Sequence, residues 1–93
     1  MRIIIKESFL NRLREQIKYI ALDSPSRARK FKSDLFSKIN EIPKKPYAYR
    51  RSIYFDDTEI RDLIFKGYTI VFKIDKNEIQ VFGILHYQKD VGE

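Results

Sequence analysis

Several side chains in this sequence are of the types that cleave RNA without a metal ion. Such cleavage needs a group that activates the 2′-hydroxyl, cations that hold the charge of the phosphorane, and an acid for the leaving oxygen. Arginine suits the second task because its planar fork binds two phosphate oxygens at once. The residues of suitable types are Arg50, Arg51, Arg61, His86 and Tyr87. Each also has an ordinary structural interpretation, as a solvated arginine, a hydrogen-bonded histidine at a strand end or a packing aromatic side chain.

The composition excludes most other chemistries. The chain has no cysteine and one histidine, which leaves no thiolate nucleophile, no zinc–thiolate site and no multi-histidine metal centre. It contains no glycine-rich phosphate loop and no serine-nucleophile motif. Four acids cluster early in the second half, at Asp56, Asp57, Glu59 and Asp62. Acids in a turn beside a strand are typical of a solvated surface, so we expect no metal and no small-molecule cofactor.

The length of 93 residues fits one domain over 1–93. A hydrophobic fraction of 43% and a charged fraction of 34% predict a folded core. No apolar run approaches the roughly 18 residues of a membrane span, and the apolar start at 3–5 is too short for a secretory signal. We therefore expect a cytoplasmic protein with no membrane partner.

The whole chain has a formal net charge of +6, and its positive charge is concentrated in the first half. Residues 1–53 hold 14 Lys and Arg against 5 Asp and Glu, whereas residues 54–93 hold 5 against 8. This asymmetry favours an anionic partner, with a solvated helical surface as the equal alternative. The candidate anion-binding or target-binding residues are Arg29, Lys30, Lys32 and Lys38 on an expected helix, and Lys44, Lys45, Arg50 and Arg51 in the loop after it.

Two helices are expected to follow a buried first strand at 3–5. Ser8 is the expected cap of the first helix, while Ser24 and Pro25 fit the N-cap and first position of the second, which ends at Pro43. Each helix carries one apolar stripe, formed by Phe9, Leu13, Ile17, Ile20 and Ala21 and then by Ala28, Phe31, Leu35, Ile39 and Ile42. The short junction predicts an antiparallel helix hairpin.

After residue 51 the apolar period changes to that of strands. The pattern predicts strands over 60–65, 68–75 and 79–87, and 52–55 could form a further one. Lys66-Gly67 is an expected turn, and Gly83 indicates a bulge or a close approach. Arg61 alternates with Leu63 and Phe65, so we expect it at the edge of an apolar face. The order β-α-α-β-β-β predicts an α+β fold, in which a mostly antiparallel four-stranded sheet packs against the helix hairpin.

Two segments carry a resemblance to a known family. Residues 19–39 read YIALDSPSRARKFKSDLFSKI, which resembles the helix–turn–helix segment of RelE/ParE-superfamily toxins of bacterial type II toxin–antitoxin modules. Residues 60–90 read IRDLIFKGYTIVFKIDKNEIQVFGILHYQKD, which is similar to the strand half of the same superfamily. The signature positions are Arg61, Leu63, Tyr68, Ile70, His86 and Asp90. The resemblance extends over nearly the whole chain.

The resemblance implies one fold with two activities. RelE-type members cleave mRNA in the ribosomal A site by 2′-hydroxyl attack, whereas ParE-type members poison DNA gyrase. RelE-type enzymes place an arginine directly after the aromatic residue that opens the third strand, and here Thr69 follows Tyr68. His86 with Tyr87 is similar to the His-Tyr pair of one mRNase branch, while His86 also fits ParE-like members.

We therefore expect a ParE-like toxin that acts on DNA gyrase and is neutralised by a cognate antitoxin protein. The first alternative is a ribosome-dependent mRNA endoribonuclease with Arg61, His86 and Tyr87 as its catalytic residues. The second is an inactive homologue that only binds the antitoxin. Fold alone does not separate these three, because the same fold supports more than one activity.

Overall fold

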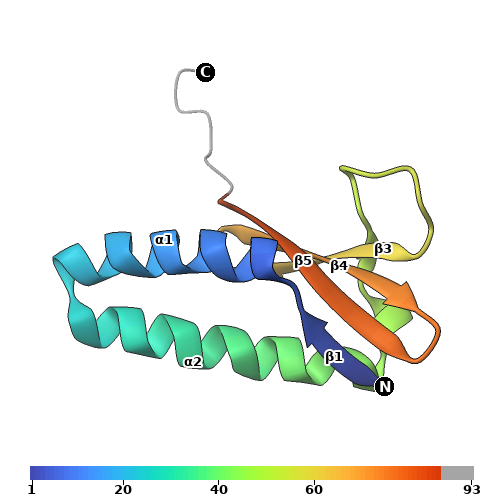
Figure 1. Cartoon of the computed structure of the whole chain (residues 1–93), viewed down its shortest axis with the longest axis horizontal. Coiled ribbons are helices and arrows are strands. Elements are labelled where there is room, and N and C mark those ends of the chain that lie inside the picture. Colours follow the sequence, from blue (N-terminus) through green and yellow to red (C-terminus); the bar gives the residue numbers. More distant parts are fainter. Residues whose placement is uncertain (87–93) are drawn as a thin grey trace.

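The computed structural model describes residues 1–86 of the chain, so Tyr87 and Asp90 lie outside the described residues. Strand β1 (Arg2–Ile5) leads into helix α1 (Glu7–Asp23), which is followed by helix α2 (Pro25–Glu41) (Figure 1). Two short 3-10 helices then precede the remaining strands. These elements are η1 (Ile42–Lys44), η2 (Pro46–Ala48), β2 (Arg50–Arg51), β3 (Ile60–Phe65), β4 (Tyr68–Asp75) and β5 (Glu78–His86).

The helix hairpin confirms the prediction from its junction. Pro25 is the first residue of α2, and the Ser24 hydroxyl accepts a hydrogen bond from the Arg27 N–H at 3.2 Å. The expected cap of α1 is wrong, because the helix begins at Glu7, one residue before Ser8. The Ser8 hydroxyl instead donates to the carbonyl oxygen of Phe82 at 2.9 Å and ties the start of α1 to β5.

The sheet has five strands in the order β1-β5-β4-β3-β2, with β1 parallel to β5 and the other pairs antiparallel. It therefore has one strand more than the four predicted, and that strand is not 52–55. The extra strand is the two-residue β2, after which the Ser52 N–H makes a last bond to the Ile60 carbonyl. The next N–H, that of Ile53, donates to the Asp62 side chain instead, which turns the chain away from β3.

Two glycines carry the local geometry predicted for them. Gly67 and Lys66 have φ of 82° and 47° in the tight turn between β3 and β4, a region that glycine adopts at little cost. Gly83 lies beside a bulge, since Val71 pairs with Gly83 while Phe72 pairs with Val81, which leaves Phe82 without a partner on β4. The close approach is also present, because a Cβ on Gly83 would lie 3.3 Å from the Val71 Cβ.

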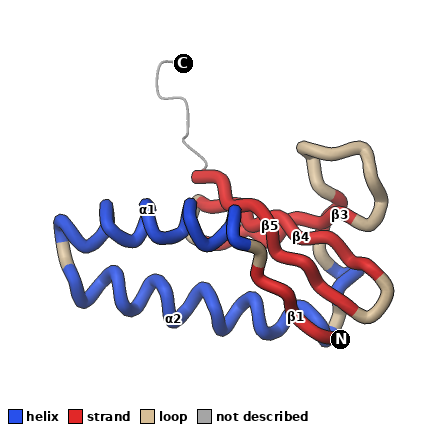
Figure 2. Tube along the Cα trace, in the orientation of Figure 1, coloured by secondary structure: helices blue, strands red, loops and turns tan. Residues whose placement is uncertain are grey.

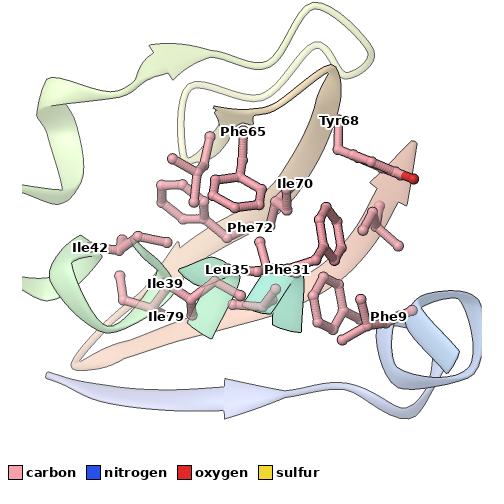
Figure 3. Close-up of a cluster of buried hydrophobic side chains, with 14 of the residues drawn as sticks. Phe9, Phe31, Leu35, Ile39, Ile42, Phe65, Tyr68, Ile70, Phe72 and Ile79 are labelled. Carbon is pink, nitrogen blue, oxygen red and sulfur yellow. The ribbon is translucent and has the colours of Figure 1, made fainter. Parts of the chain in front are cut away.

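The hydrophobic core lies between the helices and one face of the sheet (Figure 3). Strand residues with period two meet the helix stripes there, and the Phe31 ring contacts the rings of Phe65 and Tyr68 at centroid distances of 5.5 and 5.1 Å. β1 contributes less than predicted, because as an edge strand it is only half-buried, with Ile3 and Ile5 packed against the core. No helix in residues 1–86 is long and apolar enough to cross a membrane.

The opposite face of the sheet, here called the outer face, is covered in part by the β2–β3 loop (residues 52–59). Asp62, Thr69 and Val71 point to this face and are nevertheless buried. The Phe55 ring meets the Phe82 ring edge to face at a centroid distance of 5.6 Å, so the loop reaches across to the bulge of β5. Figure 2 shows this loop at the end of the molecule away from the junction of α1 and α2.

Candidate functional site

Arg61 lies on the helix-facing side of β3, as its alternation with Leu63 and Phe65 predicts. Its guanidinium donates to three backbone carbonyl oxygens, through Nε to Thr58 at 2.9 Å and through Nη1 to Tyr47 at 3.3 Å and Tyr49 at 3.0 Å. It also lies over the Tyr47 ring, 5.0 Å from the centroid. This arrangement fixes the segment around η2, and it commits two of the three guanidinium nitrogens to backbone contacts.

His86 ends β5 with its side chain exposed. Its ring stacks on Tyr68 at a centroid distance of 4.3 Å and an interplanar angle of 14°. The Tyr68 hydroxyl donates to Gln16 Oε1 at 3.0 Å, and burial, with a smaller contribution from nearby Tyr19, raises the pKa of Tyr68 above its ordinary value. The His86 ring thus rests on a tyrosine that is itself fixed to α1. Tyr87, the third candidate catalytic residue of the nuclease alternative, follows the last described residue.

Arg61 and His86 lie at opposite ends of the sheet. Arg61 pairs with Phe72 on β4, and His86 pairs with Tyr68 on the same strand. Four residues along β4 correspond to roughly 13 Å, and the two strand spacings from β3 to β5 add about 10 Å across the sheet. One phosphate group is far smaller than this separation. The two residues therefore do not form a joint site around one scissile bond.

Arg50 forms an ion pair on the outer face with a buried carboxylate. Its Nε and Nη2 lie 3.2 and 3.1 Å from Asp62 Oδ2, which also accepts the Ile53 N–H at 3.2 Å. The Asp62 side chain is 0% exposed, so the interpretation of Asp62 as a solvated turn acid is wrong. Its other oxygen, Oδ1, has no hydrogen-bond partner in the described part of the chain. Arg51, the next residue, is exposed and lies opposite Arg61 in the antiparallel pairing of β2 with β3.

Two small hollows flank the β2–β3 loop on the outer face. The first, of about 280 Å³, is lined by Arg50, Ile53, Tyr54, Ile64, Gly67, Tyr68 and Thr69. The second, of about 250 Å³, is lined by Ser8, Arg12, Phe55, Val71, Phe82, Gly83, Ile84 and Leu85. Thr69, the residue that stands in place of a RelE-type arginine, is thus buried in the wall of an apolar hollow.

The basic residues of α2 do not share one face. Arg29 and Lys38 are nine residues apart, which at about 100° per residue puts them on opposite sides of the helix. Lys30 pairs with Asp34 at 3.1 Å, and Asp34 also meets Lys66 at 3.3 Å. The Lys30 ammonium beside it, followed by Lys66, lowers the pKa of Asp34. The other candidates are exposed and make no ion pair within residues 1–86, namely Arg29, Lys32, Lys38, Lys44, Lys45 and Arg51.

A groove runs from the hairpin junction toward the sheet. Near the junction it is a hollow of about 490 Å³ lined by Tyr19, Ile20, Leu22, Asp23 and Arg27. It continues as a hollow of about 360 Å³ lined by Ile20, Arg27, Lys30, Phe31, Lys66 and Tyr68. Tyr19 is 70% exposed and Leu22 86% exposed. Neither belongs to the apolar stripe expected for α1, and an apolar helix residue outside the stripe is the sequence signal that marks them.

Within the described residues no group of three or more His, Asp or Glu side chains is arranged to hold a metal ion. The hollows and the groove described above are lined by basic and apolar side chains. The candidate cations are either tied into the fold, as Arg50 and Arg61 are, or exposed on the helices, around η1 and on β2.

The comparisons with known proteins agree with this architecture. The sequence profile of one family, described as the ParE toxin of the type II toxin–antitoxin system parDE, matches residues 3–91. The chain belongs to the ParE toxin family. It is thus a type II toxin by family, as the resemblance of residues 19–39 and 60–90 predicted.

A solved structure supports the same fold for this ParE-family toxin. The structure, titled "Chromosomal ParDE TA system from P. aeruginosa", matches with a TM-score of 0.77 and 16% sequence identity, over 95% of this chain and 97% of that one. At this identity the likeness concerns the fold alone, which confirms the predicted α+β class. A comparison with curated proteins gives no match.

Proposed function

We propose that this ParE-family toxin inhibits cell growth in the cytoplasm by poisoning DNA gyrase, and that a cognate antitoxin protein neutralises it. The observation that carries the choice of target is the surroundings of Thr69. A RelE-type nuclease needs a phosphate-binding cation at this position, whereas Thr69 is buried beside Ile53 and Ile64. Losing one charge-stabilising group commonly costs on the order of 10²–10³ in rate.

The separation of the other candidate residues supports the same choice. Arg61 donates through Nε and Nη1 to backbone carbonyl groups, and His86 lies at the far end of the sheet. A nuclease needs its base, its cations and its acid within hydrogen-bond reach of one phosphate. A gyrase poison needs only a binding surface, which this chain offers on both sides of the sheet.

The groove at the hairpin junction is the proposed antitoxin site. It combines the exposed Tyr19 and Leu22 with the cations of Arg27, Lys30 and Lys66, and its two hollows share Ile20 and Arg27. Such a groove suits a helical segment with an apolar face and flanking carboxylates. A disordered antitoxin segment that folds on contact would cover the groove and reduce the positive charge of the first half.

A gyrase supercoiling assay beside toeprinting of a translated message tests the target. We expect inhibited supercoiling with covalently trapped gyrase on DNA, and no cleavage of the message. A-site cleavage that disappears in Arg61→Ala or His86→Ala, with supercoiling unaffected, would establish the nuclease alternative. Expression without an antitoxin tests for activity of any kind, because an inactive homologue would leave growth unchanged.

Co-elution with the antitoxin tests the groove. The double variant Tyr19→Ser/Leu22→Ser removes two exposed apolar side chains without creating a cavity, so it should fold normally and lose antitoxin binding. Wild-type antitoxin affinity in this variant would contradict the proposed site.

A further inference from the structure

The β2–β3 loop exposes three successive apolar side chains. Ile53 is 66% exposed, and Tyr54 and Phe55 are each a little under half exposed. Ile64 of β3, which shares a hollow with Ile53 and Tyr54, is 55% exposed. A single exposed apolar residue is common on protein surfaces, but a contiguous group that borders hollows is typical of an interaction site. We call these four residues the outer-face patch.

The backbone beneath the patch is held in place before any partner binds. The buried Asp62 carboxylate holds Arg50 and the Ile53 N–H, and the Ser52 hydroxyl accepts the Tyr54 N–H at 3.2 Å. At the other end of the loop, the Asp57 carboxylate accepts the Glu59 N–H at 2.8 Å. A loop fixed in this way loses little further conformational entropy on binding, which favours affinity.

The charges around the patch define the chemistry of a partner. One arginine lines each hollow, Arg50 in the first and Arg12 in the second. Arg12 is exposed and makes no ion pair with any described residue, and Arg50 uses only Nε and Nη2 on Asp62. No carboxylate is among the described residues that line either hollow. The complement is a surface with apolar side chains that enter the hollows and carboxylates that face the two arginines.

We propose that the outer-face patch is the surface with which this toxin binds its protein target, through a segment of gyrase that carries apolar anchors flanked by carboxylates. This inference rests on the proposed function and names the surface that performs it. A protein fits better than DNA, because phosphates would pair with the arginines but leave Ile53 and Ile64 against water. The hairpin groove proposed for the antitoxin begins at the α1–α2 junction, which lies at the other end of the molecule from the β2–β3 loop (Figure 1), and its inner hollow shares Tyr68 with the first hollow of the patch.

The test compares full-length toxin variants in the gyrase supercoiling assay and in antitoxin co-elution. The double variant Ile53→Ser/Tyr54→Ser should raise the concentration for half-maximal gyrase inhibition by about 30-fold or more, as expected for anchors at the centre of an interface. It should still co-elute with the antitoxin. Urea unfolding checks that the variant is folded, which we expect because neither side chain is buried in the core.

Charge reversal at Arg12 gives a second test that leaves the loop intact. Arg12→Glu should weaken gyrase inhibition by about 10-fold at low salt and by less at high salt, because the proposed contact is between exposed charges. Lys18→Glu is the matched control. It makes the same charge change on the same helix, at an exposed residue outside both hollows, and should inhibit gyrase like the wild type.

Each other outcome is decisive. The patch variants are Ile53→Ser/Tyr54→Ser and Arg12→Glu. If wild-type toxin inhibits gyrase and both variants inhibit it equally well, the patch is not the target surface. If the patch variants lose the antitoxin and keep gyrase inhibition, the patch belongs to the antitoxin and the inference is wrong. A toxin dimer that the patch variants dissociate, with inhibition unchanged, would assign the patch to a second copy. If wild-type toxin fails on gyrase, the proposed function fails and this inference fails with it.

Discussion

Replacing Arg61 with alanine tests whether this side chain supports the fold rather than a phosphate. The Arg61 guanidinium donates to the carbonyl oxygens of Tyr47, Tyr49 and Thr58 and lies over the Tyr47 ring. A charged donor contributes about 1.5 kcal/mol to a shielded acceptor and less to an exposed one. The Tyr49 contact is half-buried and the other two are exposed. With a cation–π contact of about 0.5 kcal/mol, we expect Arg61→Ala to lower the free energy of unfolding by about 2–3 kcal/mol.

Urea unfolding, monitored by circular dichroism, measures this loss of stability. For a chain of this length it corresponds to a fall in Tm of roughly 10–20 °C. Arg61→Lys keeps the charge but lacks the fork that reaches several carbonyl groups, so it should lose about half as much. Arg51→Ala is the control, because Arg51 is exposed and should change stability by no more than about 0.5 kcal/mol. Wild-type stability in Arg61→Ala, with activity lost, would refute the structural role and return Arg61 to the target or substrate.

Three further predictions concern capping, pH and surface charge. Ser24→Ala removes the acceptor of the Arg27 N–H and should cost about 1 kcal/mol in urea unfolding. The pKa of Asp34 is lowered chiefly by Lys30 and that of Glu78 chiefly by Arg2, so both carboxylates stabilise the fold above their unfolded pKa values. This stability is lost as the pH falls through the folded values, and Arg2→Ala should flatten the acid limb of a pH–stability curve. Reversing the charges of Arg29, Lys32 and Lys38 should cost below about 1 kcal/mol each and weaken antitoxin binding most at low salt. Unchanged binding would make them solvated surface.

The helices and the long strands were predictable because their signals are local. The stripe on α2 and the Ser24-Pro25 start depend on residues within a few positions of one another. The alternation in β4 likewise shows its two faces without knowledge of its neighbours. The cap of α1 was not predictable in this way. The Ser8 hydroxyl donates to the carbonyl oxygen of Phe82, which lies 74 residues away in the sequence and is brought beside Ser8 by the folding of the sheet.

The candidate site was less predictable because long-range contacts decide what each charged group does. Asp62 has the sequence context of a turn acid, but pairing of β2 with β3 places it opposite Arg50 and the β2–β3 loop covers it. Arg61 has the sequence context of a phosphate ligand, but its partners are carbonyl groups up to 14 residues away. The sequence shows which residue types are present, whereas the contacts of each side chain depend on which strands the sheet brings together.

The neighbouring residues Arg61 and Asp62 explain how the long segment between α2 and β3 is fixed although its only strand, β2, has two residues. Their side chains point to opposite faces of β3, and each binds the chain on its own side of the sheet. Arg61 fixes the carbonyl groups before β2, at Tyr47 and Tyr49, and Asp62 fixes Arg50 and the N–H of Ile53 around β2. The connection is therefore held from both faces, and the exposed side chains of residues 53–55 carry none of this support. Because this support comes from Arg61 and the buried Asp62, we expect substitutions of Ile53 and Tyr54 to change the contact with a target while the fold is kept.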